Sequence, residues 1–161
     1  MQKRKAQQGF SLIELLIVVA IILLIAAISI PNLLRSRMAA NESAAVGALR
    51  TLNTAELTYL SSCPAAGFSA SLSELNTGTI CAGGQSIIDE TLATGTKSGN
   101  NFVYNPGEAD AQGLIDSYSF TAQPVSTGTT GQRSFYSDQT GVIRYELDGN
   151  TVPTNASSAL Q

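Results

Sequence analysis

Glu14 is a carboxylate inside a long apolar run, and its chemistry needs an explanation. The segment Phe10–Ile30 holds 21 residues, and Glu14 is the only charged one among them. A carboxylate in a membrane-spanning helix costs about 3 kcal/mol at the centre, less near an end, and usually has a partner. If the chain were cleaved after Gly9, the new α-amine of Phe10 would supply a cation at the same depth. One helix does not easily bring these two groups together, so we expect Glu14 to pair with the amine of a neighbouring copy. Glu14 would then fix the register between identical helices.

The rest of the composition offers little catalytic chemistry. The chain has no histidine and two cysteines. The lack of histidine removes Ser–His and Cys–His nucleophile pairs and the commonest metal ligand, and two cysteines cannot form a four-thiolate zinc site. The late acids Asp138, Glu146 and Asp148 are not spaced as in an EF-hand loop. We therefore expect no enzyme, no catalytic residues, no metal site and no cofactor, with calcium binding as a weaker alternative.

Charge is distributed unevenly along the chain, whose net charge is −3. Residues 61–161 contain nine acidic and three basic residues, which argues against a nucleic-acid partner because such proteins present a basic patch. Lys3, Arg4 and Lys5 lie directly before the apolar run, so the positive-inside rule keeps residues 1–9 in the cytoplasm and exports the remainder. As a helix the run would be about 31 Å long, which matches a hydrocarbon core of about 30 Å.

Two other kinds of segment share these features: a secretory signal peptide cleaved near Ile28 and an uncleaved signal anchor. Neither explains a charged residue at position 14. The stretch Gly9-Phe10-Ser11-Leu12-Ile13-Glu14-Leu15-Leu16-Ile17-Val18-Val19 resembles the class III signal of type IV pilins and type II secretion pseudopilins. The resemblance continues to Pro31-Asn32. It implies that a prepilin peptidase removes a leader peptide, residues 1–9, by cutting after Gly9. It also implies that Phe10 becomes the N-methylated terminus and that Glu14 is the assembly glutamate.

The helical pattern extends well beyond the apolar run and predicts one helix over residues 10–62. Pro31 removes a backbone hydrogen bond and predicts a kink between a transmembrane and assembly half, residues 10–30, and an amphipathic half, residues 31–62. Apolar residues at spacings of three and four predict a buried stripe in the second half, made of Ala45, Leu49, Leu52, Ala55 and Tyr59. The opposite face is expected to hold Glu42, Arg50, Asn53 and Thr54.

The region after the helix, residues 63–100, is rich in turn residues and contains both cysteines. In an exported chain Cys63 and Cys81 would be oxidised, and we expect them to form a disulfide. Closing a loop of this size stabilises a fold by about 3 kcal/mol in the chain-entropy model. Type IV pilins often carry their disulfide near the C-terminus, so its position after the helix departs from that pattern.

Strand signals are concentrated in residues 101–148, where they predict an antiparallel sheet of three or four strands. Aromatic and small polar residues alternate in Ser117–Ala122, and the turn Asp138–Gly141 separates two further strands. One face of the sheet would be buried against the helix by Tyr118, Phe120, Phe135 and either Val142 or Ile143. The expected fold is α+β, a ladle of one long helix and a small sheet, and residues 149–161 are expected to be a mobile tail.

These features favour a structural subunit of a type IV pilus, anchored in the bacterial inner membrane with its head in the periplasm and then assembled into a surface filament. The expected partners are further copies of the chain and, by the resemblance, a prepilin peptidase, an assembly platform and its ATPases. A pseudopilin of a type II secretion system is the first alternative. A membrane-tethered periplasmic binding domain that never polymerises is the second, and a secreted enzyme is the third.

Overall fold

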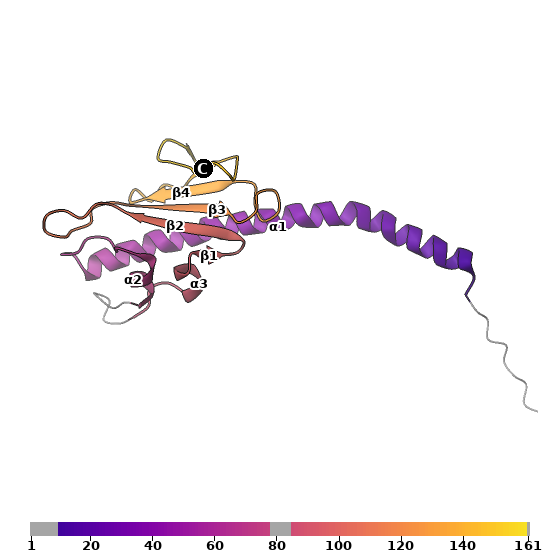
Figure 1. Cartoon of the computed structure of the whole chain (residues 1–161), viewed down its shortest axis with the longest axis horizontal. Helices are drawn as coiled ribbons and strands as arrows, with labels where there is room; N and C mark the ends of the chain where they lie inside the picture. Colours follow the sequence, from indigo (N-terminus) through magenta and orange to yellow (C-terminus); the bar gives the residue numbers. More distant parts are fainter. Residues whose placement is uncertain (1–9, 78–84, 161) are drawn as a thin grey trace, which may run out of the picture. The chain divides into compact units, whose positions relative to one another are not determined.

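The computed structural model describes residues 10–77 and 85–160 (Figure 1). Its contacts divide the chain into two units, residues 1–36 and residues 37–161, which we call the N-terminal unit and the head. Helix α1, Leu12–Ser62, contributes to both units and continues through Pro31. The single long helix is thus confirmed, whereas a kink at Pro31 stays a prediction.

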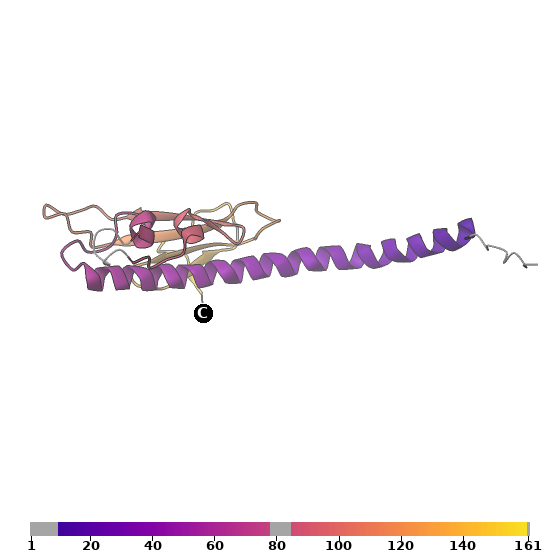
Figure 2. The same cartoon turned by 90° about the horizontal axis from the view of Figure 1, so that it is seen from below.

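The predicted buried stripe of α1 is confirmed in the head. Its five members are each at most 2% exposed: Ala45, Leu49, Leu52, Ala55 and Tyr59. They share one core with aromatic residues of the sheet, which lies alongside this part of the helix (Figure 2). Burying one large apolar side chain stabilises a fold by about 1.5–3 kcal/mol, so this stripe is what holds the helix to the sheet.

The sheet is antiparallel, and its strands follow one another in chain order. Its strands are β1 Thr96–Lys97, β2 Asn100–Pro106, β3 Tyr118–Pro124, β4 Ser134–Asp138, β5 Arg144–Glu146 and β6 Ser158–Ala159. Phe120 in β3 lies opposite Tyr104 and Ser137 on the neighbouring strands. Phe120 and Phe135 are completely buried, as the alternating pattern predicts. The predicted turn after β4 is also present, and Gly141 adopts a φ of 72° there.

The prediction of three or four strands is too low, because the described residues form a sheet of six, and the two shortest strands account for the difference from four. Strands β1 and β6 contain two residues each, too few for an alternating pattern to appear in the sequence. Strand β6 lies in the predicted tail, where it pairs with β5, and the Leu160 amide donates to the Ile143 carbonyl at 2.8 Å. Of the two candidates after the turn, Ile143 is the buried one.

Among the described residues between α1 and the sheet, two segments form short helices, α2 Leu72–Thr77 and α3 Glu90–Ala93. Each contributes one leucine to the core, Leu75 and Leu92. The side chain of Asp89 caps α3 by accepting from the Leu92 amide at 2.7 Å.

The predicted disulfide involves one residue in this part of the head and one that lies outside the described residues. Cys63 is buried directly after α1, and its thiol is not free. Cys81 falls in the gap between residues 77 and 85. The Cys63–Cys81 pairing therefore stays a prediction.

Candidate assembly surface

The N-terminal unit exposes an apolar helix surface on all its sides. From Phe10, which is 88% exposed, to Leu34, which is 46% exposed, every leucine, isoleucine and valine is exposed. Helix α1 is long and apolar enough to span a membrane, and none of its most apolar window is buried. An apolar surface of this extent requires lipid or other protein to cover it.

Glu14 lies in the first turn of this helix and is exposed. Within residues 10–77 and 85–160, its carboxylate makes no ion pair. Gly9 lies outside the described residues, so the cleavage after Gly9 and the methylation of Phe10 stay predictions. The geometry thus provides a single carboxylate on an apolar surface, in the first turn of the helix.

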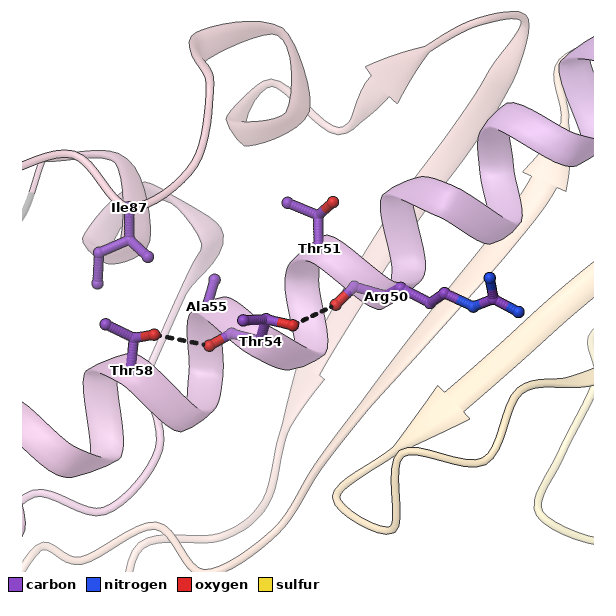
Figure 3. A pocket seen from close by; sticks show the side chains of 6 residues that line it. All are labelled: Arg50, Thr51, Thr54, Ala55, Thr58 and Ile87. Carbon is purple, nitrogen blue, oxygen red and sulfur yellow. Dashed lines mark hydrogen bonds between the residues drawn. The ribbon is translucent and has the colours of Figure 1, made fainter.

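The solvent-facing side of α1 in the head has a different character (Figure 3). Arg50, Thr51, Thr54, Ala55 and Thr58 line a shallow groove of about 440 Å³ together with Ile87. All three threonine hydroxyls of this groove are satisfied by their own helix: Thr54 donates to the Arg50 carbonyl and Thr58 to the Thr54 carbonyl, both at 2.9 Å, and Thr51 donates to the Gly47 carbonyl at 3.1 Å. These hydroxyls need no further partner, and the groove offers one cation, Arg50, among small side chains.

Glu42, on the part of α1 that lies in the head, is buried. It forms an ion pair that the sequence did not predict. Its Oε2 accepts from both Nε and Nη2 of Arg133 at 2.8 Å. Its Oε1 accepts from the backbone amides of Gln132 at 2.8 Å and Arg133 at 3.0 Å. Burial alone would raise the pKa of Glu42, but these amides and the guanidinium outweigh it and lower the pKa below its usual value.

Glu56 is completely buried and holds the segment after α1. Its two carboxylate oxygens accept from the Ser69 amide at 3.0 Å and from the Ser69 hydroxyl at 2.6 Å. The hydroxyl of Tyr104, on β2, donates to the Ser69 carbonyl at 2.6 Å. Burial raises the pKa of Glu56 despite the bonds from Ser69, because none of the described residues places a cation beside it to offset the lost hydration.

The expected solvent face of α1 is therefore partly wrong. Arg50 and Thr54 are exposed as predicted, whereas Glu42 is 6% exposed and Asn53 is 8% exposed. Asn53 donates to the Ser137 hydroxyl at 2.7 Å and accepts from the Tyr118 hydroxyl at 3.2 Å. The helical spacing contained a signal, because Glu42 and Glu56 each lie seven residues from Leu49, on the same face of the helix.

Comparison with known proteins found two short matches. The family model described as the prokaryotic N-terminal methylation motif matches residues 4–30. The type IV wide pilus major component PilA4 of Thermus thermophilus is 61% identical over 36 residues. That alignment covers 22% of this chain and 28% of the relative.

No solved structure matches the chain. The matched motif contains both Phe10 and Glu14, and the long helix packed on an antiparallel sheet agrees with a pilin-like α+β fold. The N-terminal resemblance to type IV pilins is therefore confirmed, and residues 4–30 match the prokaryotic N-terminal methylation motif.

Proposed function

We propose that the chain is a structural subunit of a type IV pilus. The single observation that carries this proposal is the exposed apolar helix of the N-terminal unit with its lone carboxylate, Glu14, inside a methylation motif. In the precursor this helix would lie in the inner membrane with the head in the periplasm. In the filament, the helices of neighbouring copies would cover the same apolar surface. Contacts with these helices would thus replace the contacts with lipid when a copy leaves the membrane.

Processing after Gly9 would create the cation that Glu14 lacks. A copy entering the filament with its helix in the wrong register would leave the carboxylate unpaired among apolar side chains, which is strongly unfavourable. Glu14 would thus select one axial offset between neighbours. The prepilin peptidase, assembly platform and ATPases are the partners that this route requires, and the chain itself would have a structural role without catalysis.

The relative supports a pilus in preference to a secretion pseudopilus, because its name describes it as a major pilus component. The alignment covers less than a third of that protein and 22% of this chain, so most of the head lies outside this comparison. A pseudopilin of a type II secretion system remains the second candidate, since its helices would assemble by the same contacts.

Mass spectrometry of the N-terminal peptide tests the processing and the destination together. We expect a peptide that begins at N-methylated Phe10 and is abundant in material sheared from the cell surface. The same peptide confined to washed membranes would identify a pseudopilin. A chain beginning at Met1, or near Ile28, would refute the proposal.

A substitution at Glu14 tests the assembly step separately. We expect Glu14→Ala to remain in the membrane but to be lost from the sheared fraction, because its neighbour's amine would have no counter-charge. Glu108→Gln, which changes an exposed carboxylate of the head, is the matched control and should assemble normally. Normal filaments from Glu14→Ala would show that Glu14 has no part in assembly, whereas the absence of filaments from the unmodified chain as well would favour a tethered domain that does not polymerise.

A further inference from the structure

The head contains a shallow, open polar depression of about 320 Å³ at one end of the sheet, which we call the polar cavity. The end of β2, the start of β3 and the end of β4 meet at this edge because adjacent strands are antiparallel. A loop after β5 supplies the remaining wall. The polar cavity is lined by Asn105, Pro106, Gly107, Ser117, Tyr118, Ser119, Tyr136, Asp138, Gln139 and Asn155. Its volume lies at the small end of the usual range for ligand pockets, about 300–1,000 Å³.

Several polar side chains in this lining have no hydrogen-bond partner in the part of the chain that the structure describes. Within residues 10–77 and 85–160, no hydrogen bond engages the side chains of Asn105, Ser117, Gln139 or Asn155. Three side-chain amides and one hydroxyl therefore line the same site. They come from β2 and from the loops beside β3, β4 and β6, and their hydrogen-bonding groups are available to a ligand. Together they can donate to and accept from one ligand.

The cavity wall also depends on a close backbone approach. The Gly107 amide donates to the Ser117 carbonyl at 2.7 Å. A β-carbon at Gly107 would lie 2.2 Å from Ser117 Oγ and 2.8 Å from the Ser117 carbonyl oxygen, too close for any side chain. Glycine is therefore required for the two segments to close together here, and this contact holds Ser117 at the rim.

The other lining groups narrow the class of ligand. Asp138 is 9% exposed, and its Oδ1 already accepts from the Thr140 amide at 3.0 Å. It is the only charged residue of the lining, so an anion would find no basic partner. A metal ion would find a single carboxylate, and within the described residues no group of three or more acids, cysteines or histidines gathers to hold a metal.

A neutral ligand rich in hydroxyl groups fits this arrangement. Amide side chains can donate and accept at once, and the half-buried ring of Tyr136 offers an aromatic surface. We propose that the polar cavity is a binding site for a neutral saccharide. Such binding belongs to the head alone and does not require the chain to polymerise.

The test uses the full chain in lauryldimethylamine oxide micelles, because a glycoside detergent would compete for the cavity. The probes are the methyl glycosides of glucose, galactose and N-acetylglucosamine, each followed by saturation-transfer difference NMR and titrated for affinity. We expect transfer to at least one glycoside. Gln139→Ala and Asn155→Ala should each weaken its affinity by about threefold to tenfold, the effect of one lost hydrogen bond.

Both substituted side chains are exposed and make no internal hydrogen bond with the described residues, so neither variant should disturb the fold. Gln132→Ala, at an exposed glutamine on the loop before β4, is the matched control and should bind as the unmodified chain does. The proposal is overturned if none of the three glycosides receives saturation. It is equally overturned if Gln139→Ala and Asn155→Ala bind with unchanged affinity, or if Gln132→Ala loses as much affinity as they do.

Discussion

Replacing Glu42 should destabilise the head, because its buried carboxylate accepts hydrogen bonds from the Arg133 guanidinium and from two backbone amides. Glu42 is 8% exposed in its side chain, whereas Arg133 is 37% exposed. Glu42→Ala would leave the guanidinium and the amides of Gln132 and Arg133 without their acceptor. Breaking a fully buried pair costs about 3–5 kcal/mol, and the partial exposure of Arg133 lets water replace some of the loss. We therefore expect Glu42→Ala to lower the free energy of unfolding by about 2–4 kcal/mol.

Glu42→Gln separates the charge from the hydrogen bonds. The amide oxygen can still accept from the two backbone amides, so we expect a loss of about 1–2 kcal/mol, smaller than for Glu42→Ala. The Arg133 guanidinium also lies over two aromatic rings, 5.6 Å from the centre of Phe135 and 5.8 Å from the centre of Tyr145. These cation–π contacts would remain in Glu42→Gln. Glu108→Gln, at an exposed position, should leave stability unchanged.

The assay is urea unfolding of the full chain in micelles, followed by near-ultraviolet circular dichroism of the tyrosines. All five tyrosines of the chain lie in the head, so the signal reports on that unit. Because the pKa of Glu42 is lowered in the folded state, its contribution is present above the unfolded pKa and is lost as the pH falls through the folded pKa. A loss below about 0.5 kcal/mol for Glu42→Ala, or one that does not shrink at acidic pH, would refute this reasoning.

Two further predictions concern the segment after α1. The raised pKa of Glu56 means that its carboxyl favours folding most below the unfolded pKa, and this contribution is lost as the pH rises through the folded pKa. Urea titrations should show the unmodified chain losing stability relative to Glu56→Gln over that rise, and a constant difference would contradict the prediction. Gly67→Ala should destabilise more than Gly113→Ala in thermal unfolding, and equal effects would contradict it. Both glycines have positive φ, but only at Gly67 would a β-carbon meet the Ile115 carbonyl, at 2.1 Å.

The parts of this protein that sequence alone determined depend on neighbours in the chain. The apolar run with Glu14 is a local pattern, and so is the stripe from Ala45 to Tyr59, because residues three and four apart share one face of a helix. The turn at Gly141 is equally local. For these features the residue types and their spacing contain the physical cause, and the fold class followed from them.

Only the tertiary structure decided the partners that lie far apart in the sequence. Glu42 and Arg133 are separated by 91 positions, so the helical spacing that places Glu42 on the buried face could not identify Arg133 as its partner. Strands β1 and β6 are too short to have a pattern and exist because longer strands offer them an edge. The polar cavity likewise arises where three strand ends and a loop converge. Long-range packing determines such contacts because a buried polar group is stable only when the fold brings its partner to it.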